Sequence, residues 1–371
     1  MIPVSTPLLD GNERKYLLEC LDTGWISSEG PFVRQFEERF AALVGRQHGV
    51  AVSNGSTALD LAVAALGLGQ GDEVILPSFT IISCAAAIVR AGATPVVVDS
   101  DPHTWNMTAD GVAAAITPRT KAIMVVHIYG LPVDMDPILG LAAKHGLKLI
   151  EDAAEMHGQT CRGRPCGGFG DISTFSFYSN KHIATGEGGM ILTDDASLAE
   201  RCRSLRNLGF QEKKRFVHEE LGWNFRLTNL QAALGLAQLE RLPEHIMRKR
   251  RMGQQYDMLL NNLPDVQRPL PSTSYAENIY WVYGLVLGDA HPFDAEEAMR
   301  RLAEAGVATR PFFWPMHEQP VFRKKGLFQG VRCPVAERLA RRGFYLPSGL
   351  GLSQEDQFTV AGAVSALLKR N

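Results

Sequence analysis

Between residues 49 and 152, short runs of apolar residues alternate with segments of helical periodicity. The runs are rich in valine, isoleucine and leucine, which favours buried strands. We expect strands at 49–52, 73–77, 94–99, 121–127 and 147–152, separated by helices at 56–66, 79–91, 108–116 and 137–145. This order predicts βαβ units, and therefore an α/β fold with a mostly parallel sheet flanked by helices on both faces.

The remaining periodic segments predict two domains. Further helices are expected at 10–24, 31–44, 196–208 and 227–242, and one more helix follows up to about residue 260. Pro243 separates the last two of these helices. Beyond them, strands are expected at 281–287 and 308–313 and helices at 295–305 and 354–369. We therefore predict a large domain at 1–245 and a smaller C-terminal α/β domain at 246–371.

Composition and charge exclude several classes of partner. The 371 residues carry a net charge of -2 without a basic stripe, so we expect no nucleic acid as partner. No apolar run approaches the roughly 18 residues of a membrane-spanning helix, and the first residues lack a signal-peptide pattern, so we expect a cytoplasmic protein without membrane contact. The six cysteines are not spaced as zinc ligands, and we expect reduced thiols and no metal.

One lysine follows a strand-like run at 174–178. Lys181 comes after the turn-forming pair Ser179-Asn180 and precedes a glycine-rich loop. Desolvation beside a buried strand favours the neutral amine, which is a nucleophile suited to bonding with an aldehyde. A lone loop lysine is more often a surface residue, so the catalytic interpretation depends on the rest of the chain.

Two further features point to a phosphate and to a buried acid. Ser56 and Thr57 begin a predicted helix, where free N–H groups and hydroxyls can bind phosphate, although an ordinary N-cap has the same sequence. Asp152 ends a predicted buried strand, where a carboxylate needs a cationic or protonated partner. His127 and Tyr129 follow the neighbouring strand, so we expect them at the same ligand-binding edge of the sheet.

Together these features predict a cofactor. Pyridoxal 5'-phosphate requires a helix start for its phosphate, an acid that keeps its pyridine nitrogen protonated and a lysine for its aldehyde. The motifs of rival cofactors are missing: there is no dinucleotide-binding glycine fingerprint, no Walker lysine loop and no nucleophile elbow. We therefore predict a pyridoxal-phosphate enzyme with Lys181 and Asp152 as catalytic residues.

Six motifs also carry a family resemblance. They are Asn54-Gly-Ser-Thr-Ala-Leu, Gly71-Asp-Glu-Val-Ile-Leu-Pro-Ser, Ile150-Glu-Asp-Ala-Ala-Glu, Phe175-Ser-Phe-Tyr-Ser-Asn-Lys, Gly186-Glu-Gly-Gly and Gly222-Trp-Asn-Phe-Arg-Leu-Thr-Asn. With them the chain resembles the DegT/DnrJ/EryC1/StrS nucleotide-sugar aminotransferases nearly end to end. The resemblance implies fold type I of the pyridoxal-phosphate-dependent aminotransferases, which is the fold of aspartate aminotransferase.

By this resemblance, Lys181 bonds to the cofactor aldehyde and Asp152 holds the pyridine nitrogen. Glu155 would lie near the cofactor ring, and the phosphate would be bound by Ser56, Thr57 and Ser176.

The resemblance also implies a homodimer with shared active sites, in which Asn224 reaches the phosphate of the neighbouring subunit's cofactor. Ile81 stands where several relatives carry an aromatic residue, so it would offer the cofactor ring apolar contact only. His182, directly after the lysine, departs from the apolar residue that is usual there.

Four other motifs indicate the substrate: Leu9-Asp-Gly-Asn-Glu-Arg, Thr23-Gly-Trp-Ile-Ser-Ser, His127-Ile-Tyr-Gly and Arg310-Pro-Phe-Phe-Trp-Pro-Met-His. They resemble members that transfer the amino group of L-glutamate to GDP-4-keto-6-deoxy-D-mannose, giving GDP-perosamine and 2-oxoglutarate. Candidate substrate contacts are His127, Tyr129, His182, Arg310 and His317. For Arg310 and His317, a solvated arginine and a structural histidine are equally typical.

Three alternative functions have to be weighed against this one. A UDP- or dTDP-linked keto sugar, aminated at C4 or C3, would require the same cofactor residues. The family's dehydratase branch carries histidine at the position of Lys181, so the lysine favours amino transfer. A non-catalytic regulator that binds pyridoxal phosphate would lack the lysine or carry a DNA-binding extension, and the sequence shows neither feature.

Overall fold

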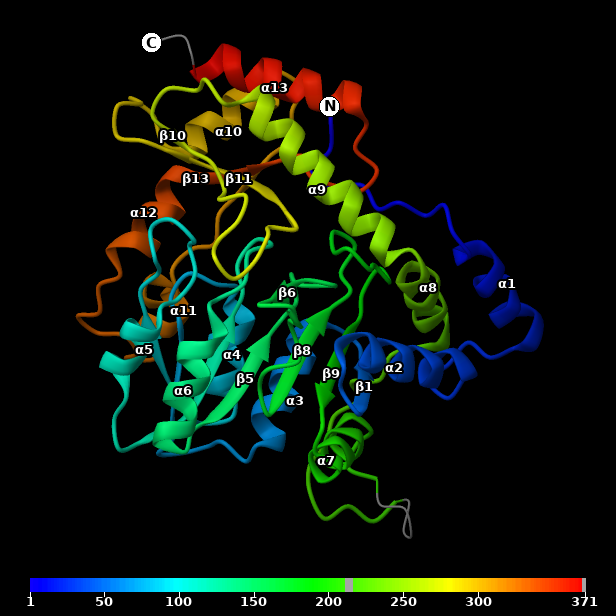
Figure 1. Cartoon of the computed structure of the whole chain (residues 1–371). Coiled ribbons are helices and arrows are strands. Elements are labelled where there is room, and N and C mark those ends of the chain that lie inside the picture. The colour runs from blue at the N-terminus through cyan, green and yellow to red at the C-terminus, as the bar shows by residue number, and fades with distance from the viewer. Residues whose placement is uncertain (211–215, 369–371) are drawn as a thin grey trace.

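Seven strands form the central sheet of the computed structural model, which describes residues 1–210 and 216–368 (Figure 1). Their order is β1-β9-β8-β5-β4-β2-β3. They are β1 (His48–Val52), β2 (Glu73–Pro77), β3 (Thr94–Val98), β4 (Thr120–Val126), β5 (Lys148–Asp152), β8 (Ile172–Ser176) and β9 (Gly189–Thr193). Neighbouring strands from β3 to β8 are parallel, whereas β9 is antiparallel to both β8 and β1. The predicted mostly parallel sheet is confirmed.

Alternate residues of the strands pack into two apolar layers, one on each face of the sheet. In β2, Val74 and Leu76 belong to one layer and Ile75 to the other. The first layer includes α3 (Gly55–Ala65), α4 (Ile82–Arg90) and α7 (Ala196–Arg206), and the second includes α2 (Pro31–Val44), α5 (Ala109–Ala115), α6 (Met135–His145) and α8 (Asn229–Glu240). Helix α1 (Glu13–Thr23) lies against α8. Burial on both faces explains why these strands read as continuous apolar runs.

A second, four-stranded antiparallel sheet has the order β10-β11-β13-β12. Its strands are β10 (Val266–Gln267), β11 (Tyr283–Leu287), β12 (Arg310–Pro311) and β13 (Gly343–Leu346), and its apolar cluster includes α9 (Leu242–Leu259), α10 (Ala295–Glu304) and α13 (Gln354–Leu368). Helix α9 is continuous across residue 245, so the division into 1–245 and 246–371 stays a prediction. Over the described residues, no helix has the length and apolar character needed to cross a membrane.

The segment after β12 returns to the first sheet. Phe312 and Met316 are buried in the layer of α3 and α4, and η1 (Met316–Glu318), α11 (Pro320–Arg323) and α12 (Pro334–Arg342) follow. The sequence predicted a strand over 308–313, but only Arg310 and Pro311 pair with β13. Proline has no N–H to donate to a sheet, which limits strand length in a segment with prolines at 311 and 315.

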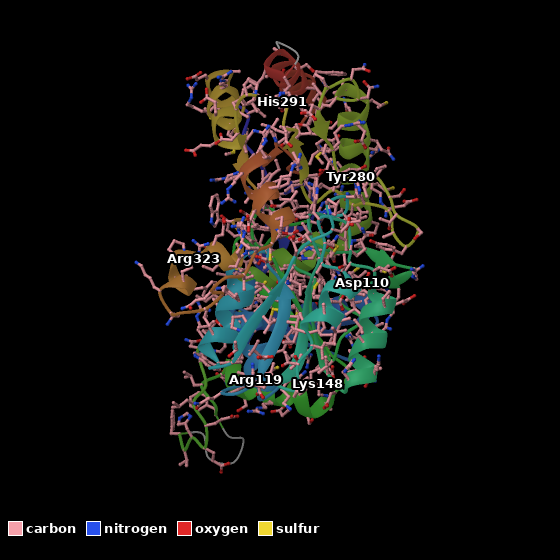
Figure 2. All side chains as sticks on the ribbon, turned by 90° about the vertical axis from the view of Figure 1, so that its left-hand side faces the viewer. Asp110, Arg119, Lys148, Tyr280, His291 and Arg323 are labelled. Atoms are coloured by element: carbon pink, nitrogen blue, oxygen red, sulfur yellow. The ribbon has the colours of Figure 1, made fainter. Side chains whose placement is uncertain are left out.

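The carboxyl ends of the parallel strands are directed toward the second sheet. Arg119 and Lys148 lie at the amino ends of β4 and β5, and Figure 2 shows both at the end of the molecule opposite Tyr280. Asp152 and Ser176, the last residues of β5 and β8, therefore lie at the edge that faces the second sheet. This is the edge at which parallel sheets bind ligands.

Candidate active site

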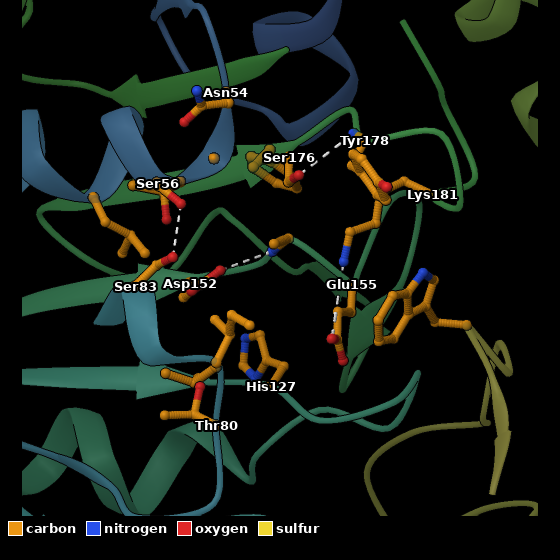
Figure 3. Close-up of a pocket in the computed structure, with 18 of the residues that line it drawn as sticks. Asn54, Ser56, Thr80, Ser83, His127, Asp152, Glu155, Ser176, Tyr178 and Lys181 are labelled. Carbon is orange, nitrogen blue, oxygen red and sulfur yellow. Dashed lines mark hydrogen bonds and ion pairs between the residues drawn. The ribbon is translucent and has the colours of Figure 1, made fainter. Parts of the chain in front are cut away.

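A cavity of about 530 Å³ opens between the carboxyl ends of β5 and β8, the starts of α3 and α4, and the second sheet (Figure 3). Seven of the predicted site residues line it: Ser56, Ile81, His127, Asp152, Glu155, Ser176 and Lys181. The fold thus brings the predicted lysine, carboxylates and hydroxyls to one place.

Lys181 lies in the turn after β8, and its side chain extends into the cavity (Figure 3). Its backbone N–H donates to the carbonyl of Tyr178 at 2.9 Å, which closes the turn. Its Nζ lies 3.8 Å from Oε1 of Glu155. Burial lowers the pKa of Lys181, although the carboxylates of Glu155 and Asp152 oppose this shift. The amine therefore becomes neutral at a lower pH than an exposed lysine, as a nucleophile or proton acceptor requires.

Glu155 faces Lys181 from the loop after β5. Its Oε2 accepts a hydrogen bond from the backbone N–H of Tyr129 at 2.6 Å. Tyr129 has φ +57°, a left-handed conformation that is rare for a bulky residue and is held here by its surroundings. Burial raises the pKa of Glu155 to about 8, against opposing effects of Lys181 and the Tyr129 N–H. Glu155 therefore keeps its proton near neutral pH.

Asp152 is 3 % exposed and ends β5 at the floor of the cavity. Its Oδ1 accepts the N–H of Ala154 at 3.0 Å, and its Oδ2 accepts the thiol hydrogen of Cys84 at 3.3 Å. Burial raises the pKa of Asp152, while these two hydrogen bonds and Lys181 act in the opposite direction. A cationic group brought to this carboxylate would restore the favourable pairing that burial removes.

His127 lines the cavity with both ring nitrogens already hydrogen-bonded. Its Nδ1 accepts the N–H of Val133 at 3.0 Å, which leaves the proton on Nε2 to donate to Oε1 of Glu151 at 3.0 Å. Burial would raise the pKa of Glu151, but the hydrogen bond from His127 and those from backbone N–H groups lower it overall. His127 therefore offers the cavity ring surface and no free hydrogen-bonding nitrogen.

Hydroxyl groups and the start of α3 form another part of the cavity. Oγ of Ser56 lies 2.6 Å from Oγ of Ser83, and Oγ of Ser176 accepts the N–H of Tyr178 at 3.4 Å. A Cβ at Gly55 would lie 2.7 Å from Cβ of Ser176, so only glycine permits this approach of α3 to β8. The first turn of a helix carries N–H groups without helical acceptors, and with these hydroxyls it can bind an anion.

Thr57 is placed differently from the other predicted phosphate ligands. Its hydroxyl donates to the carbonyl of Asn54 at 2.8 Å, and its N–H donates to Oδ1 of Asn54 at 2.9 Å. Its Oγ1 also accepts the N–H of Asn54 at 3.2 Å, which completes a capping box at the start of α3. Thr57 does not line the cavity, and its side chain fixes the helix start instead.

Three predicted substrate contacts are buried side chains outside the cavity lining. Tyr129 is buried among aromatic rings that include Phe312 at 4.8 Å between ring centres. His182 is 2 % exposed, and among the described residues neither of its ring nitrogens has a hydrogen-bond partner. His317 bridges Oγ of Ser78 at 2.7 Å and Oε1 of Glu337 at 3.1 Å. These side chains belong to the packing around the site.

Arg310 and Asn224 are exposed residues outside the cavity lining. Arg310 lies opposite Tyr345 on the neighbouring strand of the second sheet. Because Tyr345 lines the cavity, Arg310 is one strand away from the cavity lining. Oδ1 of Asn224 accepts the Nε–H of Arg226 at 2.9 Å.

The cavity is also lined by residues that the sequence patterns did not predict as ligands: Ser83, Tyr178, Trp281, Phe313 and Tyr345. Trp281 and Tyr345 belong to the second sheet region and reach the cavity only through tertiary packing. Periodicity could mark Trp281 as the start of a strand, but no local pattern links it to Lys181. The aromatic run from Arg310 to His317 was the available signal for Phe313.

A buried lysine that faces two carboxylates at the ligand-binding edge of a parallel sheet defines an aminotransferase-like site. The chain belongs to the DegT/DnrJ/EryC1/StrS aminotransferase family, whose model matches residues 7–365. The family predicted from the motifs is thereby confirmed.

Full-length relatives carry a more specific name. A GDP-perosamine synthase of Caulobacter vibrioides is 45 % identical over 368 residues, covering 99 % of this chain and 98 % of the relative. A GDP-perosamine synthase of Escherichia coli O157:H7 is 42 % identical over 364 residues, covering 98 % of both. Among solved structures, the aminotransferase TlmJ from Streptoalloteichus hindustanus has a TM-score of 0.92 and 35 % identity, over 100 % of this chain and 99 % of that chain. The predicted α/β aminotransferase fold is confirmed.

Replacing His317 by alanine is expected to lower the free energy of unfolding by about 2 kcal/mol, because Ser78 and Glu337 lose a buried partner. The amino-transfer rate per folded molecule should change little. Urea unfolding and steady-state kinetics measure the two effects, with the exposed His145→Ala as control. A large rise in KM at unchanged stability would instead make His317 a substrate contact.

Proposed function

We propose that this aminotransferase transfers the amino group of L-glutamate to C4 of GDP-4-keto-6-deoxy-D-mannose, giving 2-oxoglutarate and GDP-perosamine. The observation that carries the proposal is the buried amine of Lys181 beside Glu155 and Asp152, in a chain with full-length relatives named GDP-perosamine synthase. The buried amine supports amino transfer, and the relatives support the GDP-linked acceptor.

Pyridoxal 5'-phosphate fits the donor groups that line the cavity, and we infer that it is the cofactor. Ser56, Ser176 and the first turn of α3 would hold its phosphate. Asp152 would hold the pyridine nitrogen, whose positive charge would offset the burial of this carboxylate. Lys181 would reach the aldehyde. When bound, the cofactor supplies an electron sink for the negative charge left on a substrate carbon after proton removal.

The protein's own part in the reaction is proton transfer inside the cavity. Because burial favours its neutral amine, Nζ of Lys181 can accept the proton from the substrate carbon, and it would then deliver this proton to the cofactor carbon. Glu155 keeps a proton near neutral pH and its Oε1 lies 3.8 Å from Nζ, so the amine faces a mostly neutral carboxyl group. Ile81 and Phe313 add apolar surface to the cavity, which limits water and strengthens its electrostatic interactions.

A panel of acceptors tests the proposed substrate. After incubation with L-glutamate, the absorbance of the cofactor should change, and GDP-4-keto-6-deoxymannose should reverse the change. We expect kcat/KM for this sugar to exceed that for UDP- or dTDP-linked 4-keto sugars by at least about 10²-fold, since contacts to the base must discriminate. Double-reciprocal plots should be parallel. If only a UDP or dTDP sugar reverses the change, amino transfer holds and the acceptor is different.

We also propose that the protein is a homodimer in which Asn224 serves the partner subunit's site. Asn224 is exposed and lies outside the cavity lining of its own chain. Large apolar side chains flank it in sequence: Leu221 is 91 % exposed and Trp223 is 39 % exposed. Exposed apolar groups close together in the sequence support an interaction surface, and a symmetric dimer would bury two copies of it.

Mixed dimers test the shared site. Lys181→Ala and Asn224→Ala should each impair the homodimer. In a dimer of one chain of each kind, one site carries both substitutions and the other carries neither, so activity should return to about half that of the unsubstituted dimer. Two different affinity tags isolate the mixed species. If verified mixed dimers stay inactive, each site is built from one chain.

A further inference from the structure

Trp281 lies directly against the amine of Lys181. Nζ of Lys181 is 3.7 Å from the centre of the indole ring. Trp281 precedes β11 of the second sheet, whereas Lys181 follows β8 of the first sheet. Both residues line the cavity, and Trp281 is 5 % exposed. The amine is therefore enclosed between the indole on one side and Glu155, at 3.8 Å, on another.

The position of the indole ring is fixed by several contacts. Its Nε1 donates to the carbonyl of Asn180 at 3.0 Å, the residue immediately before the lysine. The backbone carbonyl of Trp281 accepts a hydrogen bond from Nζ of the buried Lys249 at 2.7 Å. The ring also packs against Tyr129, with 5.8 Å between ring centres. An aromatic face held in this way is preorganised to receive a cation without losing side-chain freedom.

The other groups that act on the amine do not replace this contact. The acidic neighbours of Lys181 are Glu155 and Asp152, and Glu155 is mostly uncharged near neutral pH because burial raises its pKa to about 8. His157 is fully buried, and burial lowers its pKa to about 3, so it is neutral and adds no charge. An aromatic face attracts an ammonium by its quadrupole and needs no ionisation of its own.

We propose that Trp281 is a positioning residue that holds the side-chain amine of Lys181 inside the cavity when it is not bonded to the cofactor, and that its indole face stabilises the ammonium that forms when this amine takes up a proton. Amino transfer frees the lysine during each cycle, and a free lysine side chain has many rotamers. The indole face keeps the amine beside Glu155 and within reach of the substrate carbon. This catalytic consequence rests on the proposed function, whereas the contact itself is a property of the chain.

Competitive acetylation of the full chain, freed of cofactor by dialysis against hydroxylamine, tests the contact. The labelling rate of Lys181 at pH 7 is compared with that of the exposed Lys148 in the same sample by mass spectrometry. Trp281→Leu should label about tenfold faster at Lys181, because loss of the aromatic face disfavours the charged form. Trp281→Phe keeps an aromatic face and should label within about threefold of the unsubstituted chain.

Trp105→Leu is the matched control, since Trp105 is 3 % exposed and packs in the same aromatic cluster without contacting Lys181. In this variant the labelling rate of Lys181 should equal that of the unsubstituted chain. Equal acceleration in Trp105→Leu and Trp281→Leu, or none in Trp281→Leu, would reduce Trp281 to a packing residue and overturn the proposal. If the labelling rates are as expected but the protein transfers no amino group to any keto sugar, the contact holds and the proposed function is rejected.

A second measurement leaves the core intact in case Trp281→Leu does not fold. Tryptophan fluorescence of the cofactor-free chain should change as Lys181 loses its proton on raising the pH, because the charge leaves the face of Trp281. The change should be absent from Lys181→Ala and from Trp281→Phe. A change that persists in both variants has another origin and contradicts the proposed contact.

Discussion

Replacing Lys181 by alanine is expected to abolish amino transfer, with a fall in kcat of at least about 10⁴-fold. The substitution removes the only amine that lines the cavity among the described residues. It therefore removes both the nucleophile for the cofactor aldehyde and the group that moves the substrate proton. Steady-state kinetics with L-glutamate and the GDP-linked keto sugar measure the loss.

Borohydride reduction followed by peptide mapping supplies a second measurement. In the unsubstituted chain it should attach the cofactor to the peptide that carries Lys181, and in the variant no lysine should be labelled. Lys148→Ala is the matched control: this exposed lysine forms a surface ion pair with Asp171, so its loss should leave the rate unchanged. A fully active Lys181→Ala chain would reject the mechanism.

Replacing Asp152 by asparagine is expected to lower kcat/KM by about 10²- to 10³-fold, because one preorganised electrostatic group is lost at nearly constant shape. An amide cannot carry the negative charge that keeps a pyridine nitrogen protonated. Asp152 is 3 % exposed, so water cannot replace the carboxylate. The cofactor should also dissociate more readily, which equilibrium dialysis would measure.

The pH profile separates loss of charge from loss of structure. Burial raises the pKa of Asp152, so its ionised form is lost as the pH falls through that raised value. Cofactor binding by the cofactor-free chain should therefore weaken on the acid side, and binding by Asp152→Asn, measured by equilibrium dialysis, should lack that dependence. Asp171→Asn, at the amino end of β8, is the control. Equal losses in both variants would indicate general destabilisation.

Local patterns determined much of the first sheet. The predicted strand 73–77 agrees with β2, and the predicted strand 147–152 contains β5. The run at 174–178 was displaced by two residues from β8, because Phe177 and Tyr178 are apolar residues of the following turn. Periodicity reports burial on one or two faces of a segment. It carries no information on strand order or direction, so the antiparallel course of β9 was not predicted.

The sequence by itself also determined which side chains could perform the chemistry, since a lysine after a buried strand, an acid at a strand end and a serine at a helix start are local features. Only the tertiary structure decided which of them meet. It placed Lys181 beside Glu155 and brought Trp281 from the second sheet onto the amine, while Thr57 and His317 received other partners. Contacts between distant segments depend on how the two sheets and their apolar layers pack together, and no window of neighbouring residues contains that information.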